Sequence, residues 1–113
     1  MDKVTKYKIL ISSIIDQFEF ADNPSQEVKS ILVKDIDRGQ FLVFSDGWRD
    51  KKRRIYGCSV HIEVTKEGKI WMREDTTDPP IVQILLDNGV PKEDIVLAYY
   101  APIVREDAGF AMG

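Results

Sequence analysis

The sequence predicts a two-layer α+β fold, an antiparallel meander sheet of four to five strands packed by an N-terminal helix and a short C-terminal helix. Three observations lead to it. The first twenty residues have the apolar spacing of an amphipathic helix, and four β-rich runs separated by turn residues follow them. Proline and glycine then mark the two ends of a second helix. The predicted order is α-β-β-β-β-α-β.

The length and composition indicate one soluble domain spanning residues 1–113. Of the 113 residues, 43% are hydrophobic and 31% are charged, which is typical of a folded globular protein. The single cysteine, Cys58, excludes an internal disulfide and fits a reducing compartment. The apolar run at residues 9–11 ends at two serines, so we expect neither a signal peptide nor a membrane span. These features predict a cytoplasmic protein.

The first predicted helix has Asp2 as its N-cap and one apolar stripe about 140° wide, the width of a core-facing helix. Ile9 lies nearly opposite this stripe, and we expect it to be an ordinary exposed apolar residue. We expect Phe20 to lie beyond the helix, which residues 22–25 break; the alternative is that Ile9 and Phe20 form part of a subunit contact. The stripe consists of Val4, Tyr7, Leu10, Ile11, Ile14, Ile15 and Phe18.

Four strands are predicted next, over residues 28–36, 41–44, 54–65 and 69–74. Gly39 supplies the positive φ that a tight hairpin between the first two requires. The third strand alternates strictly, and alternate residues of a strand point to opposite faces. One face is predicted to hold Tyr56, Cys58, Val60, Ile62 and Val64, and the other Ile55, Gly57, Ser59, His61 and Glu63.

The C-terminal third is predicted to hold one helix, a short turn and a fifth strand. Asp78 is the expected N-cap, because proline at position 79 is tolerated in a first helical turn. Ile81, Ile84 and Leu85 form the apolar face of this helix, and Gly89 ends it. A turn at residues 91–94 precedes the apolar strand 95–100, which stops before a proline.

No set of side chains on these elements predicts catalysis. Cys58 and His61 are three residues apart on a strand and should therefore point to opposite faces. Ser59, His61 and Glu63 share a predicted face, but neighbours two apart on a strand are separated by about 7 Å, too far for a hydrogen-bonded relay. We predict a non-enzymatic protein, with a small hydrolase or nuclease centred on His61 as an alternative.

Neither a metal ion nor a cofactor is predicted. One histidine and one cysteine on opposite strand faces lack the clustered ligands of a zinc site. The acidic residues around 35–37 and 74–78 do not have the spacing of a calcium loop, and no glycine-rich phosphate loop is present.

Residues 49–54 are the strongest charge feature, with five cations in six positions and with Trp48 and Tyr56 on either side. A net charge of −3 and a pI near 5.1 argue against a protein that coats DNA, which is normally basic. One interpretation is a solvated hairpin loop, and the alternative is direct DNA binding through this loop. The cations are Arg49, Lys51, Lys52, Arg53 and Arg54.

The sequence resembles the XisI family from the N-terminal helix to the final residues around Phe110. The segment 88–97 belongs to the pattern, whereas Asp78 stands where glutamate is usual and Tyr100 where histidine is common. The other matching residues are Gly47-Trp48, Arg54, Tyr56-Gly57, His61, Gly68-Lys69-Ile70-Trp71, Pro102 and Arg105.

This resemblance implies a controlling factor for programmed DNA-element excision in cyanobacteria, during heterocyst differentiation. It further implies two partners, a site-specific recombinase and a companion protein, XisH. We therefore predict an accessory factor that acts by protein contact, as a homodimer or with the companion. The candidate contact residues are Trp48, Tyr56, His61, Trp71 and Phe110, and burial in the core is the alternative interpretation of each aromatic residue.

Overall fold

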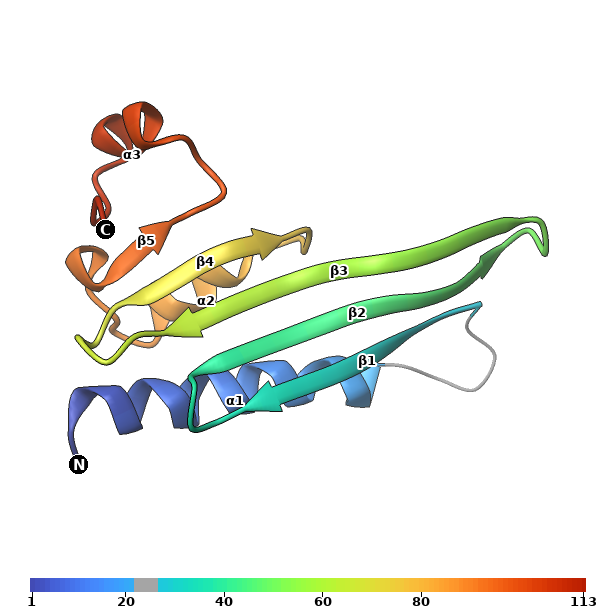
Figure 1. The fold of residues 1–113 in the computed structure, drawn as a ribbon, viewed down its shortest axis with the longest axis horizontal. Coiled ribbons are helices and arrows are strands. Elements are labelled where there is room, and N and C mark those ends of the chain that lie inside the picture. The colour runs from blue at the N-terminus through green and yellow to red at the C-terminus, as the bar shows by residue number, and fades with distance from the viewer. Residues whose placement is uncertain (22–26) are drawn as a thin grey trace.

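The computed structural model describes residues 1–21 and 27–113, and for residues 19–21 it describes the backbone alone. Figure 1 shows a long helix beneath a strongly elongated sheet, with the C-terminal segment at one end. The predicted break at 22–25 lies outside the described residues. The elements are α1 (Lys3–Ala21), β1 (Val28–Asp35), β2 (Gln40–Arg49), β3 (Arg53–Val64), β4 (Ile70–Asp75), α2 (Ile81–Asp87), η1 (Lys92–Asp94), β5 (Ile95–Leu97) and α3 (Pro102–Ala108).

The five strands form one sheet in the order β1-β2-β3-β4-β5. The predicted antiparallel meander is confirmed for the first four strands. It is wrong for β5, which pairs parallel to β4 from Ile70–Ile95 to Met72–Leu97. The reason is the connection, because α2 and η1 carry the chain back to the start of β4, as a parallel crossover requires. The sheet is therefore mixed.

Helix α1 confirms the predicted apolar stripe. Asp2 caps it, with Oδ1 accepting a hydrogen bond from the Thr5 backbone N–H at 2.8 Å. Ile9 is 55% exposed, as expected. Phe20 lies within the helix, so its predicted place beyond the helix end is wrong, and its side chain is outside the described part. The stripe residues that are buried are Tyr7, Ile11, Ile14 and Ile15, and Val4, Leu10 and Phe18 are partly buried against the core.

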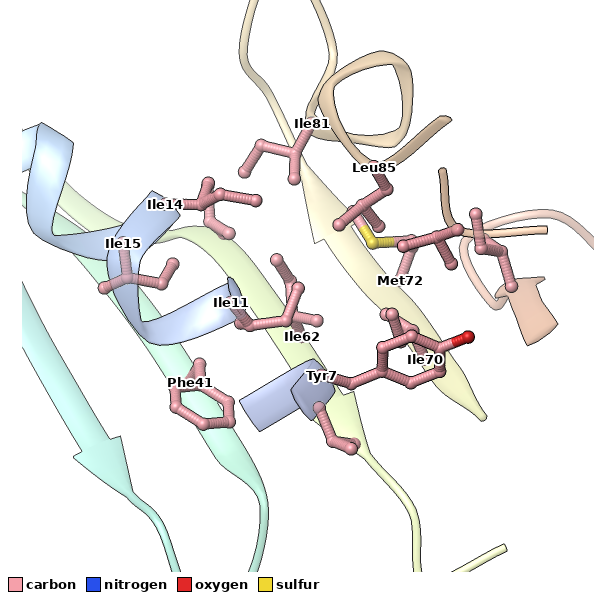
Figure 2. Packing of buried hydrophobic residues seen from close by; sticks show 14 of the residues in the cluster. Tyr7, Ile11, Ile14, Ile15, Phe41, Ile62, Ile70, Met72, Ile81 and Leu85 are labelled. Carbon is pink, nitrogen blue, oxygen red and sulfur yellow. The ribbon is translucent and has the colours of Figure 1, made fainter. Parts of the chain in front are cut away.

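Both α1 and α2 pack their apolar side chains against one face of the sheet. Ile11 of α1 lies beside Ile62 of β3, and Leu85 of α2 lies near Met72 of β4 (Figure 2). All four side chains are fully inaccessible to solvent. This shared core covers one sheet face and fixes which strand residues point inward.

Strand β2 is longer than predicted, because it continues through Ser45, Asp46 and Gly47. Such residues are poor strand formers, but here each one pairs with both β1 and β3. Gly47 is required by close packing, since a Cβ at this position would lie 2.0 Å from the Glu27 carbonyl oxygen. The ladder thus extends the β2–β3 hairpin well beyond the helices and β4 (Figure 1).

A β-bulge in β3 overturns the strict alternation predicted for that strand. Val43 pairs with Val60, whereas Phe44 pairs with Cys58, which leaves Ser59 as an extra residue. One inserted residue moves the side chain of every earlier residue in the strand to the opposite face of the sheet from the one predicted. The side of the sheet predicted for Tyr56 and Cys58 is therefore wrong, because only Val60, Ile62 and Val64 of that set lie in the core.

The start of α2 differs from the prediction, because Asp75 and not Asp78 supplies the capping carboxylate. The Ile81 backbone N–H donates to Asp75 Oδ2 at 2.7 Å. Two prolines follow Asp78 and have no N–H to donate, so the first available donor is that of Ile81. The predicted end is confirmed, with Gly89 at a φ of 84° after the helix.

We expect Asp75→Ala to lower the free energy of unfolding by about 1–2 kcal/mol, the usual cost of a lost cap. Asp78→Ala serves as the matched control and should change it by less than about 0.5 kcal/mol. Urea denaturation of both variants measures the two values. An equal loss in both would refute the assignment of the cap to Asp75.

The chain after β5 forms the turn 98–101 and helix α3, which the sequence did not predict. The Arg105 side chain holds this segment in place, since its Nε donates to the carbonyls of Leu97 at 3.2 Å and Tyr100 at 2.9 Å. Its terminal nitrogens donate to the carbonyls of Ala98 and Met112. Within the described residues, no helix is long and apolar enough to cross a membrane.

Candidate functional site

The sheet face turned away from α1 carries exposed apolar side chains on β1, β2 and β3, and we call it the open face. Lys34 of β1 points toward α1, where its Nζ donates to Ser12 Oγ at 2.9 Å. Ile31 and Val33 lie three positions and one position before Lys34 along the strand, so their side chains point to the opposite face of the sheet. There they are 41% and 43% exposed. Contiguous exposed apolar patches mark contact sites, whereas single exposed apolar residues are normal on a protein surface.

A row of stacked side chains continues the open face along the β2–β3 hairpin. The Arg54 guanidinium lies 5.5 Å from the centre of the Trp48 ring and 5.1 Å from that of Tyr56. Tyr56 in turn stacks on Phe44, with ring centres 6.2 Å apart. Arg54 also forms a 2.6 Å ion pair with Asp46. These contacts order the row in advance of binding, although Trp48 and Tyr56 remain 51% and 63% exposed.

His61 lies on the same face, between two buried core residues of β3. Its Nε2 is 2.7 Å from Gln40 Oε1. The pKa of His61 is lowered below its ordinary 6.5, mainly by burial and secondly by the positive charge of Arg73. The ring is therefore neutral at pH 7. Glu63 is engaged by Arg73, whose Nε donates at 3.0 Å.

The C-terminal segment partly covers the other end of the open face. Trp71 is half-buried, with the guanidinium groups of Arg73 and Arg105 at 5.1 and 5.7 Å from its ring centre. Phe110 packs against the core, and Lys92 Nζ lies 5.3 Å from its ring. The structure therefore places Trp48, Tyr56, His61 and Trp71 on one face, and it sets Phe110 apart from them.

The bulge also changes the arrangement of the residues considered for catalysis. Cys58 and His61 lie on the same face, so their predicted separation to opposite faces is wrong. They are nevertheless not hydrogen-bonded to each other. Cys58 Sγ donates to the Val60 carbonyl at 3.3 Å, and His61 is hydrogen-bonded to Gln40. Burial raises the pKa of the Cys58 thiol, which disfavours the nucleophilic thiolate.

The predicted common face of Ser59, His61 and Glu63 is also wrong. The Ser59 hydroxyl is hydrogen-bonded to that of Ser45, on the core side of the sheet. His61 and Glu63 point to the open face. Across the described ranges 1–21 and 27–113, no group of three or more His, Cys, Asp or Glu residues is arranged to hold a metal ion.

The basic segment forms the turn that joins β2 to β3. Asp50 and Lys51 have positive φ values of 52° and 61°, and the Lys52 N–H donates to the Arg49 carbonyl at 3.0 Å. Of its five cations, Arg54 is the one drawn into the stacked row. The other four side chains, of Arg49, Lys51, Lys52 and Arg53, are exposed.

Comparison with known proteins assigns the chain to a family. A family model described as "XisI protein" matches residues 1–112. The chain belongs to the XisI family. No curated protein is similar enough to match it.

Two crystal structures of family members from Anabaena variabilis ATCC 29413 have the same fold. An XisI-like protein is 31% identical, with a TM-score of 0.85, and the match covers 97% of this chain and 99% of that one. The fdxN element excision controlling factor XisI is 33% identical, with a TM-score of 0.82, and the match covers 99% of this chain and 100% of that one. The fold and the family assignment therefore agree over the whole chain.

Sequence reasoning missed Ile31, Val33 and Phe44 as members of the open face. The signal was weak, because residues 31–33 are apolar without interruption and do not reveal which of them point inward. Their direction follows only from the structure, where the Lys34 side chain is directed at α1 and so fixes the direction of its neighbours on β1.

Proposed function

We propose that this protein is a non-enzymatic accessory factor for the excision of a DNA element and that it acts through protein contacts. Its partners in this proposal are an XisH-type companion and the recombinase. Support comes from the relative that is named an excision controlling factor at 33% identity. The hydrogen bonds of Cys58, Ser59 and His61 to other groups also favour a role other than catalysis.

The observation that carries the proposal is the open face, a sheet surface with four large apolar side chains more than 40% exposed. Each buried apolar Å² contributes about 25 cal/mol, so covering this face favours association. Sheet pairing and the Arg54 stack hold the side chains in place, which limits the conformational entropy lost on binding. The four are Ile31, Val33, Trp48 and Tyr56.

In the absence of the companion, we propose that a second copy of the chain covers the same face and forms a homodimer. The face carries charges of both signs, with Asp46 and Arg54 on the hairpin and Glu63 and Arg73 beside His61. In a two-fold symmetric dimer the same surface of both copies meets, so this surface must complement itself. A face with charges of both signs can do so, because positive groups of one copy can lie opposite negative groups of the other.

The double variant Ile31→Thr/Val33→Thr tests this use of the face. Threonine keeps the β-branched shape that a strand favours but replaces the ethyl group of Ile31 and one methyl group of Val33 with a hydroxyl. We expect the affinity for the companion, measured by isothermal titration, to fall about tenfold or more. The matched control is Ile36→Thr, which changes a 47% exposed apolar residue in the turn after β1. It should leave the affinity unchanged.

Unaltered affinity in a well-folded double variant would exclude the open face as the contact surface. An equal loss in the double variant and in Ile36→Thr would point to a general effect of surface hydrophobicity. Thermal unfolding of all three proteins separates either result from misfolding.

A further inference from the structure

The end of the β2–β3 hairpin projects beyond the rest of the sheet (Figure 1). β1 pairs with β2 only as far as Gly47, and β4 pairs with β3 only as far as Val60. Past Gly47, among the described residues, β2 and β3 pair as strands only with each other, while Glu27 accepts hydrogen bonds from the Trp48 N–H at 3.2 Å and, through Oε2, from the Asp50 N–H at 3.4 Å. We call residues 49–53 of this hairpin the hairpin tip, and it lies at the end of the molecule opposite α3.

The hairpin tip concentrates positive charge on a protein whose net charge is −3. It holds four exposed cations and a single carboxylate, that of Asp50. In the part of the chain that the structure describes, none of these four cations takes part in an ion pair. The cations are Arg49, Lys51, Lys52 and Arg53.

Arg54 does not belong to this cationic group, because its charge is used inside the hairpin. It pairs with Asp46 at 2.6 Å, donates to the Gly47 carbonyl at 2.9 Å and lies between the Trp48 and Tyr56 rings. Arg54 thereby covers one face of each ring. The available chemistry of the tip is that of point charges and guanidinium groups, which bind phosphates.

We propose that the hairpin tip binds the phosphate backbone of duplex DNA. A two-stranded ribbon fits the major groove, which is about 12 Å wide, and four unpaired cations at its end can contact phosphates on either side. The contact is independent of base sequence, because it rests on charge and not on hydrogen bonds to bases. It goes beyond the proposed function, since none of the tip residues 49–53 is among the four apolar side chains of the open face on which that function rests.

Fluorescence anisotropy with a labelled 20-base-pair duplex tests the proposal through two variants that lose equal charge. Lys51→Gln/Lys52→Gln removes two charges from the tip, and Lys6→Gln/Lys66→Gln removes two exposed charges elsewhere. We expect the tip variant to bind at least tenfold more weakly at about 50 mM salt. The slope of log K against log salt should fall by about two. The control should match the wild-type protein.

A second tip variant, Arg49→Gln/Arg53→Gln, repeats the test in case the lysine variant does not fold, and it should show the same loss. Absence of duplex binding by the wild-type protein at low salt would overturn the proposal. So would equal losses in the tip and control variants, which indicate bulk charge, or binding of polyglutamate in preference to DNA. Undiminished companion binding by the tip variants would show that the tip and the open face act separately.

Discussion

Replacing Ile11 with alanine is expected to lower the free energy of unfolding by about 3–4 kcal/mol. The Ile11 side chain is fully buried at the centre of α1, where it faces Ile62 of the sheet (Figure 2). Truncation removes its transfer free energy and leaves a cavity that a close-packed core closes only partly. Urea denaturation monitored by circular dichroism measures the change.

Ile9→Ala is the matched control, since it makes the same truncation two residues earlier on the same helix. Ile9 is 55% exposed, so we expect a change within about 0.5 kcal/mol. Comparable losses in the two variants would contradict the orientation of α1 on the sheet.

Tyr7→Phe is expected to cost about 1–3 kcal/mol, although it removes only one oxygen atom. The Tyr7 hydroxyl donates to Asp94 Oδ2 at 2.5 Å, and Asp94 is only 7% exposed. Lys3 Nζ reaches the other carboxylate oxygen at 3.3 Å. Among the described residues, no buried side-chain nitrogen or oxygen lacks a hydrogen-bond partner, and this variant would create one at Asp94. Tyr56→Phe, which removes an exposed hydroxyl, should be neutral.

The same contact predicts a dependence on alkaline pH. Burial, followed by the hydrogen bond to Asp94, raises the pKa of Tyr7 from 10.0 to about 12. The folded state thus holds this proton more tightly than the unfolded state. Its contribution to stability is complete below pH 10 and disappears as the pH rises through about 12.

Wild-type protein should therefore lose more stability between pH 9 and about 12 than Tyr7→Phe does, as measured by urea midpoints at each pH. Burial also raises the pKa of Tyr99, which is present in both proteins, so the difference between them isolates Tyr7. Parallel curves for the two proteins would contradict this assignment.

Helix α1 follows from local chemistry and was predicted, whereas pairings set by distant contacts were not; α3 was missed although Pro102 and Gly109 mark its two ends. The stripe of α1 needs only the helical period, and all seven of its residues pack against or within the core. The bulge at Ser59 has no comparable local signature, because β3 remains an alternating strand on both sides of it. The parallel pairing of β5 likewise depends on where α2 and η1 return the chain.

For the candidate site, too, one part was predicted from the sequence and another part was not. Trp48, Tyr56, His61 and Trp71 were selected by residue type, but the prediction did not place them on one face. That placement depends on the bulge, which brings Tyr56 to the side of the sheet that His61 occupies. Ile31 and Val33 could not be selected from sequence, since apolar strand residues are as typical of a core as of an interface.

Size-exclusion chromatography with light scattering tests the central claim, that this protein works through protein contacts. The protein is run alone, then mixed with its XisH-type companion, and the mixture is repeated with the Ile31→Thr/Val33→Thr variant. We predict a dimer for the protein alone, a joint complex with the companion, and loss of that complex in the variant. Separate elution of two well-folded wild-type proteins, with this one monomeric, would contradict the account.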